Sequence, residues 1–235
     1  GVNIDLSEAF FSKLLGRSVK RGEFGVANFF FPTDESREAT TKSIIERRLA
    51  EAQLPVLLWR SVPVNLDAIN EASARCQRPL KQLIFGFPED LRSASDALAF
   101  ERRINDTMVA IEEIAYSDPE LEGFYPCSMS SRTVVYKGRL NSDELVPYFQ
   151  DLTEPEQKIS IFMFHTRFST NTDPASHMAQ PFCRIAHNGE LNTDKKNRLS
   201  EAAIASLQKR QLVYEKCPLD TERRGQTITR RMIQD

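Results

Sequence analysis

Apolar residues recur along the chain in two spacings, and each spacing predicts a different kind of element. Segments in which apolar residues alternate with others, and in which β-branched and aromatic side chains are frequent, predict β-strands at residues 25–31, 55–62, 80–85, 133–137, 159–168 and 182–187. Residues 36–52 and 96–116 carry apolar side chains three or four positions apart, which is typical of amphipathic helices. The second helix is expected to end near Asp118-Pro119, because proline disfavours a helical conformation of the residue before it.

The order of these elements indicates the fold class. Helices alternate with strands in the first half of the chain, whereas the second half contains more strands and more loop-forming dipeptides. Helices combined with a mostly antiparallel sheet predict a layered α/β or α+β sandwich. The weak boundary near residues 117–123 has no flexible linker, so we expect no pair of independent domains.

Composition and charge exclude several classes of function. The 235 residues are 40% hydrophobic and 27% charged, and their formal net charge of -2 gives no general attraction for nucleic acids or anionic membranes. No apolar run approaches the ~20 residues that cross a bilayer, and the first residues lack the pattern of a secretory signal. We therefore expect a cytoplasmic protein that binds neither nucleic acid nor membrane.

The positions of cysteine and histidine argue against a metal site and against a disulfide framework. Cys76, Cys127, Cys183 and Cys217 lie far apart without a Cys-x-x-Cys pair, so we expect reduced, buried and inert cysteines. The three histidines lack the spacing of metal ligands, so no metal is expected. A nucleophilic pair of Cys183 and His187 is disfavoured, because ~13 Å of extended chain separates the two residues.

Two segments carry groups suited to binding a small anionic ligand. In residues 159–168 a period of two places His165 and Arg167 on one face of the strand, with Arg167 at the end of that face. The guanidinium either forms a salt bridge at the end of the sheet, which this segment alone favours, or binds a carboxylate. Asn188 and Gly189 either form a hairpin turn or present a side-chain amide and a backbone N–H to an oxyanion.

Four ordered segments resemble one known family. They are residues 124–138 (FYPCSMSSRTVVYKG), 165–172 (HTRFSTNT), 179–182 (AQPF) and 186–193 (AHNGELNT), and they resemble the glutaminase domain of the glutamate synthase large subunit. The resemblance covers residues 1–198, with a helical insertion at about residues 86–118, and leaves residues 199–235 as a polar tail. It implies an α+β fold, the αββα sandwich of N-terminal-nucleophile enzymes, in which residues 127–132 and 133–137 are expected to form adjacent strands of one sheet.

The resemblance also implies a reaction, a set of partners and a role in nitrogen assimilation. In class II glutamine amidotransferases the thiolate of an N-terminal cysteine attacks the glutamine amide, ammonia leaves, and water releases glutamate from the thioester. In the whole enzyme that ammonia reaches a synthase domain that uses FMN, an iron–sulfur cluster and reducing equivalents, and we expect none of these cofactors in this chain. The expected ligands are L-glutamine and L-glutamate, and the expected partner is a synthase domain or subunit.

Site residues are carried over from the family one position at a time. Arg167 matches the arginine that holds the α-carboxylate of glutamine, and Asn188 and Gly189 match the oxyanion hole. Asp220, in the only local Asp-Thr-Glu context, matches the aspartate that pairs with the glutamine ammonium, although a helix N-cap explains this residue equally well.

The catalytic cysteine is the position at which this sequence departs from the family. Residue 1 is glycine, which has no side chain to act as a nucleophile. Neither Cys127 nor Cys183 carries its own α-amine as a base, so we expect residues 1–235 alone to be inactive. A nucleophile-free module that senses glutamine or docks to a partner is the alternative interpretation.

Overall fold

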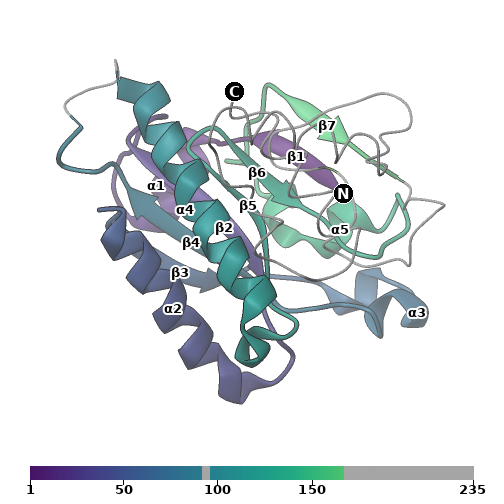
Figure 1. The fold of residues 1–235 in the computed structure, drawn as a ribbon. Helices are drawn as coiled ribbons and strands as arrows, with labels where there is room; N and C mark the ends of the chain where they lie inside the picture. Colours follow the sequence, from purple (N-terminus) through teal and green to yellow (C-terminus); the bar gives the residue numbers. More distant parts are fainter. Residues whose placement is uncertain (92–95, 167–180, 182–235) are drawn as a thin grey trace, which may run out of the picture.

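Two antiparallel β-sheets form the centre of the molecule (Figure 1). A computed structural model describes residues 1–91, 96–166 and 181 of the protein. Within them, the larger sheet has the strand order β3-β4-β2-β5, and the smaller sheet has the order β6-β1-β7. The larger sheet consists of β2 (Phe24–Phe30), β3 (Val56–Ser61), β4 (Leu80–Gly86) and β5 (Tyr125–Ser130). The smaller sheet consists of β1 (Val2–Asp5), β6 (Thr133–Tyr136) and β7 (Phe162–Phe164).

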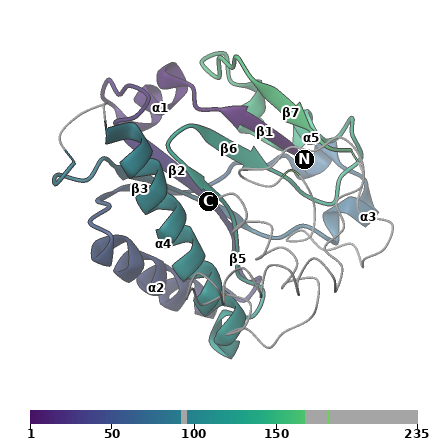
Figure 2. The same ribbon diagram turned by 45° about the horizontal axis from the view of Figure 1, so that its top comes forward.

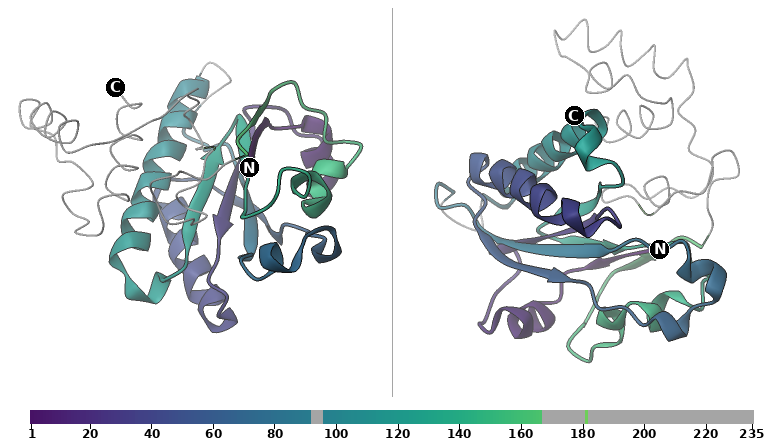
Figure 3. Two further views of the ribbon diagram at one scale, coloured as in Figure 1. Left: turned by 90° about the vertical axis from the view of Figure 1, so that its right-hand side faces the viewer. Right: turned by 90° about the horizontal axis from the view of Figure 1, so that it is seen from below.

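Helices lie on both outer sides of the two sheets (Figure 3). Helices α2 (Glu38–Glu51) and α4 (Ala97–Ser117) cover the outer face of the larger sheet. On the other side lie α1 (Glu8–Leu15), α3 (Glu71–Ala74) and α5 (Leu145–Tyr148). Short 3-10 helices occur at Glu35–Arg37, Leu66–Ala68, Pro119–Leu121 and Gln150–Thr153. This layering confirms the predicted α+β sandwich.

The two faces of the larger sheet belong to two separate clusters of buried apolar residues. Phe24 and Val26 of β2 point into the cluster that also contains residues of the smaller sheet, α1 and α5. Ala27 and Phe29 point the other way, into the cluster formed with α2 and α4. Because both faces of β2 are covered, all seven of its residues are buried, and its sequence is apolar at nearly every position instead of alternating.

Glycine at position 25 is required by this packing. Gly25 of β2 lies directly opposite Phe85 of β4, and the phenylalanine ring lies over the glycine. A Cβ atom on residue 25 would lie 2.3 Å from Cζ of Phe85, which is closer than such atoms approach in folded proteins. The absent side chain therefore allows the aromatic ring to fill the core at this point.

Most predicted elements agree with the structure. The predicted helices 36–52 and 96–116 correspond to α2 and α4, and α4 ends at Ser117, directly before Asp118-Pro119. The predicted strands 25–31, 55–62, 80–85 and 133–137 correspond to β2, β3, β4 and β6. Within the described part of residues 159–168, β7 covers only Phe162–Phe164. The predicted strand 182–187 lies outside the described residues.

One prediction about strand pairing is wrong. Residues 127–132 and 133–137 were expected to lie beside each other in one sheet, but β5 belongs to the larger sheet and β6 to the smaller one. The chain turns at Ser131-Arg132 and crosses from one sheet to the other. Side chains link the two segments, because the Ser128 hydroxyl accepts a hydrogen bond from the Val135 backbone N–H at 3.1 Å. The segment therefore joins the two layers of the sandwich.

Candidate functional site

The smaller sheet leads directly to the first predicted site residue. Strand β7 ends at Phe164, and Arg167 is three residues further along the chain. Arg167, Asn188, Gly189 and Asp220 all lie outside the described residues. Their placement in the predicted site therefore stays a prediction, and the structure describes only the strand that precedes Arg167 in the sequence.

Three residues form a row across this end of the smaller sheet. Gly1 and His165 are joined by two hydrogen bonds, from the Gly1 nitrogen to the His165 carbonyl at 2.8 Å and from the His165 N–H to the Gly1 carbonyl at 2.9 Å. On the other side of β1, Val2 pairs with Tyr136, and the same register continued by one residue places Lys137 opposite Gly1. Figure 2 shows β6, β1 and β7 side by side at this end of the chain.

Lys137 is a buried cation that the sequence interpretation did not single out. Only 1% of its surface is exposed, and its ammonium lies 5.3 Å from the centre of the Tyr125 ring. A buried ammonium loses its hydration, and the face of an aromatic ring offsets part of that loss. The sequence hints at this burial only by placing the lysine directly after the apolar run Val134-Val135-Tyr136. That hint is weak, because lysines at strand ends are more often exposed.

A carboxylate at the far end of β1 holds the chain that enters β7. The Asp5 side chain accepts hydrogen bonds from the backbone N–H groups of Ser160 at 2.8 Å and Ile161 at 3.0 Å, and it pairs with Arg21. Burial alone would raise the pKa of Asp5, but these two backbone donors and the Arg21 guanidinium together lower it. Asp5 is therefore held as a charged group that fixes where β7 begins.

A serine reinforces the same connection. The Ser7 hydroxyl donates a hydrogen bond to the Glu156 carbonyl at 2.6 Å and accepts one from the Lys158 backbone N–H at 3.2 Å. Ser7 also accepts a hydrogen bond from the Phe10 backbone N–H and thus caps the first turn of α1. One side chain therefore links the start of α1 to the segment before β7.

A polar network joins the two sheets inside the core. The Arg60 guanidinium pairs with the Asp151 carboxylate, and Arg60 also donates to the Gln82 side-chain carbonyl at 2.8 Å. The Tyr136 hydroxyl donates to Asp151 at 2.9 Å, and Gln82 donates to Asn28 at 2.9 Å. Burial, followed by the nearby Asp151 charge, raises the pKa of Tyr136, so this hydroxyl stays protonated. The network positions β6, the strand that Lys137 directly follows.

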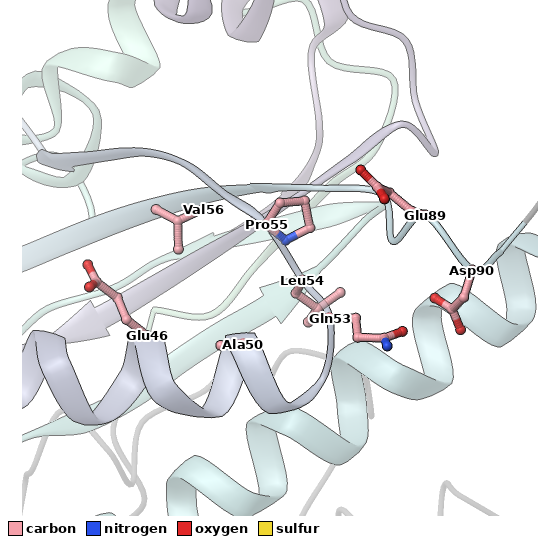
Figure 4. A pocket seen from close by; sticks show the side chains of 8 residues that line it. All are labelled: Glu46, Ala50, Gln53, Leu54, Pro55, Val56, Glu89 and Asp90. Carbon is pink, nitrogen blue, oxygen red and sulfur yellow. The ribbon is translucent and has the colours of Figure 1, made fainter.

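A cavity of about 590 Å³ lies elsewhere, beside the C-terminal end of α2 (Figure 4). Its lining comes from α2, the start of β3 and the segment after β4, and not from β1, β6 or β7. Of its carboxylates, Glu46 accepts a hydrogen bond from the Trp59 indole, and Asp90 pairs with Arg103. This cavity is separate from the row of Gly1, Lys137 and His165, and we assign it no part in the candidate site.

The described cysteines do not form a set of thiolate ligands. The Cys127 thiol is directed at the Val135 carbonyl at 3.6 Å, whereas the sulfur of Cys76 accepts from the Arg139 guanidinium at 3.5 Å. They therefore do not fit an iron–sulfur cluster, which needs several cysteines around one centre. Cys127 is buried as predicted, but Cys76 is partly exposed, because it follows the short helix α3 at the surface, so the prediction of burial is wrong for Cys76.

The described part of the chain has neither a candidate metal centre nor a candidate membrane span. Residues 1–91 and 96–166 contain no group of three or more histidine, cysteine or acidic side chains arranged to hold a metal ion. In the same residues, no helix combines the length and the apolar character needed to cross a membrane.

Comparison with known proteins assigns the family. Residues 1–219 match the family of class-II glutamine amidotransferases. The chain is 30% identical over 205 residues to the large chain of NADPH glutamate synthase from Azospirillum brasilense, and 31% identical over 201 residues to the corresponding chain from Bacillus subtilis strain 168. It is 31% identical over 210 residues to a chloroplastic ferredoxin-dependent glutamate synthase from Oryza sativa subsp. japonica.

These alignments cover 84%, 84% and 88% of the chain but only 13% of each relative. The chain therefore corresponds to a small part of the relatives it matches. The family match includes the predicted site residues Arg167, Asn188 and Gly189, and it ends one residue before Asp220. Because the match extends over most of the chain, and because the two-sheet sandwich agrees with it, the chain belongs to the class-II glutamine amidotransferase family.

Proposed function

We propose that this domain hydrolyses the side-chain amide of glutamine and supplies the ammonia to a glutamate synthase. The observation that carries the proposal is the family match over residues 1–219, together with relatives named as glutamate synthases. The sandwich of two antiparallel sheets with outer helices supports it, because that architecture is the one the resemblance implies.

Each predicted site residue has a role in this reaction. The planar fork of Arg167 binds the α-carboxylate of glutamine, and Asp220 pairs with its ammonium. Asn188 and Gly189 donate hydrogen bonds to the oxyanion that forms when a thiolate attacks the amide carbon, which is worth about 3 kcal/mol per donor in the transition state. The C–N bond then breaks, the nitrogen takes up a proton and leaves as ammonia, and water hydrolyses the thioester to glutamate.

The nucleophile of this reaction is not among residues 1–235. In the family it is an N-terminal cysteine, whereas residue 1 here is glycine. We propose that glutamine hydrolysis belongs to a polypeptide in which such a cysteine accompanies these residues, and that the described residues supply the frame. Asp5, Ser7 and the Gly1–His165 pair fix the strand that leads to Arg167.

The partner of the domain is proposed to be a glutamate synthase region that receives the ammonia. The relatives are about eight times longer than the matched region, since it covers 13% of each. FMN and an iron–sulfur cluster, which the resemblance implies for a synthase, would supply redox chemistry there. No step of amide hydrolysis requires them.

Binding of glutamine can be tested without the nucleophile. A small amino acid with few contacts is expected to bind with a dissociation constant of about 1 mM, or roughly -4 kcal/mol. Loss of one charge-assisted pair, about 1.5–3 kcal/mol, would make binding to Arg167→Ala too weak to detect. The exposed Arg132 provides a control with the same change of charge. Isothermal titration calorimetry would measure the binding of glutamine to the unchanged protein, to Arg167→Ala and to Arg132→Ala. Equal binding of glutamine by the unchanged protein and by Arg167→Ala would refute the role of Arg167.

The same protein fused to an N-terminal cysteine in the family's arrangement tests hydrolysis directly. Release of ammonia from glutamine, measured enzymatically, is the expected result. Binding of glutamine without any release of ammonia by that protein would instead support the alternative, a module that senses glutamine.

A further inference from the structure

The cavity beside α2 adjoins a strand edge that has no partner within the described part of the chain. Strand β3 is the last strand of the larger sheet, so β4 pairs with only one of its two edges. The Val62 N–H donates to the Leu80 carbonyl, and bonded and non-bonded pairs alternate along an antiparallel ladder. The N–H and C=O groups of Trp59 and Ser61 therefore point away from β4, as a row of groups open to a further strand.

Most of this edge also lacks the features that usually prevent pairing with another chain. Exposed edges are commonly interrupted by lysine, by proline or by a bulge. Residues 58–61 (LWRS) contain neither lysine nor proline, and their one charged side chain, Arg60, pairs with Asp151. The register with β4 shifts only between Val56 and Leu58, at the start of the strand. The regular part of the edge can therefore accept an added strand.

The cavity lies where this edge begins (Figure 4). Its volume of about 590 Å³ falls within the range of ligand pockets, roughly 300–1,000 Å³. Its apolar wall comes from Ala50, Leu54, Pro55 and Val56, and 41% of Val56 is exposed. Because residues 53–56 lead directly into β3, a segment paired with the edge of β3 reaches this wall when it continues beyond the start of the strand.

The charge of the cavity favours a cationic occupant. Glu46 and Glu89 line it, both are exposed, and neither has an ion pair within the described residues. The third carboxylate of the lining, Asp90, is balanced by Arg103. The C-terminal end of α2 lies beside the cavity, and a helix end of this kind carries about half a negative charge. Opposite charge and an apolar wall together suit a lysine or arginine, whose long stem is apolar.

We propose that the cavity and the free edge of β3 form one docking groove for an extended basic segment of a partner protein. The segment adds to β3 as an antiparallel strand through the backbone groups of Trp59 and Ser61. A lysine or arginine that follows its pairing residues then lies over Val56, with its charge near Glu46 or Glu89. The groove shares no residue with the predicted glutamine site, so the inference is independent of the proposed function.

Fluorescence anisotropy with a labelled peptide tests the groove on the whole protein. The probe is Thr-Val-Thr-Val-Lys-Gly-Lys, in which the first four residues favour an extended strand and the lysines follow them. A second peptide carries norleucine in place of both lysines, which keeps the apolar stems and removes the charges. Two further peptides carry N-methyl groups on alternate residues, one peptide for each edge of the strand, since only the N–H groups on one edge can pair with β3.

A protein variant removes the charge of the groove. It combines Glu46→Gln with Glu89→Gln and leaves an acceptor for the Trp59 indole. Glu71→Gln is the control, because Glu71 is an exposed carboxylate of α3, on the other side of the molecule (Figure 3).

The expected result is that the double variant binds the lysine peptide about tenfold more weakly than the unchanged protein does. Glu71→Gln should bind it normally, and the norleucine peptide should bind the unchanged protein and the double variant equally weakly. One N-methylated peptide should lose binding, and the other should keep it.

The inference is overturned if the lysine peptide does not bind, if the norleucine peptide binds as tightly, or if both N-methylated peptides keep their binding. Spermidine that binds as tightly as the lysine peptide would show a cavity for cations in general, without strand pairing, and would also overturn it. Sedimentation equilibrium tests the remaining occupant. A dimer of the protein that the peptide dissociates would assign the groove to a second copy of this chain, against the inference.

Discussion

Replacing Asp151 by asparagine should destabilise the protein strongly, because the change leaves a buried guanidinium without its counter-charge. The side chains of Arg60 and Asp151 are 14% and 2% exposed, so water can replace little of the lost interaction. Asparagine has nearly the same size, but its amide offers one acceptor where the carboxylate offered two. Its NH₂ group would also face either the Arg60 guanidinium or the Tyr136 hydroxyl, which are both donors to Asp151.

The magnitude follows from this burial. Removing one partner of a buried ion pair costs about 3–5 kcal/mol, because the remaining charge is left uncompensated. Replacing both partners by apolar residues of similar size, as in Arg60→Met with Asp151→Leu, should recover much of that loss. An exposed pair provides the comparison, because Arg75 and Glu71 are 74% and 80% exposed and such pairs contribute little.

Urea unfolding measures these differences. Asp151→Asn should lower the midpoint without changing the slope of free energy against urea concentration, since the unfolded state gains no new exposure. Glu71→Gln should leave the midpoint nearly unchanged. The reasoning is refuted if Asp151→Asn costs less than about 1 kcal/mol, the range typical of exposed pairs, or if the double variant is no more stable than the single one.

Three further predictions concern acid stability, core packing and activity. Hydrogen bonds to the Glu144 carboxylate lower its pKa from 4.5 to about 2, so its contribution is complete above pH 4.5 and disappears as the pH falls through about 2. The thermal midpoint of the protein should therefore exceed that of Glu144→Gln at neutral pH, and the gap should close over that range. Gly25→Ala should cost about 1–3 kcal/mol in urea unfolding, because the new methyl group overlaps the Phe85 ring, and Phe85→Leu should recover part of this cost. Residues 1–235 alone should release no ammonia from glutamine, and a release abolished by Cys127→Ala or Cys183→Ala would contradict that expectation.

The elements that could be predicted from the sequence are those in which the spacing of apolar residues matches the period of the helix or strand. β2 and α4 have apolar positions at the spacing of their own secondary structure, so their approximate bounds could be derived. The apolar pattern did not indicate strand β5, and only the family resemblance predicted a strand there, at residues 127–132. Pro126 argues against a strand in the middle of a sheet. The structure shows why proline fits: β5 lies at the edge of the described sheet, and its register with β2 shifts between Asn28 and Phe29, next to Pro126.

Strand β1 and helix α1 were missed although their signals are present. Ser7 caps α1, and Gly16 ends it with a positive φ of 63°, which is the conformation that glycine adopts most easily at a helix end. Both signals were available, but the predicted elements began only at residue 25. The burial of Lys137 could not be predicted in the same way, because it depends on the packing of its side chain over Tyr125, a contact that no local pattern reveals.

The polar network between the sheets connects these observations to the site. β6 ends at Tyr136, and Lys137 follows it directly in the chain. Tyr136 is fixed by Asp151, which is fixed in turn by Arg60 of the larger sheet. The contacts of Tyr136 fix the backbone of β6, whose register pairs Tyr136 with Val2. Because Lys137 follows Tyr136, they also fix the position of Lys137 opposite Gly1. The same network that stabilises the sandwich therefore determines where the buried ammonium lies relative to the strand that leads to the predicted carboxylate-binding arginine.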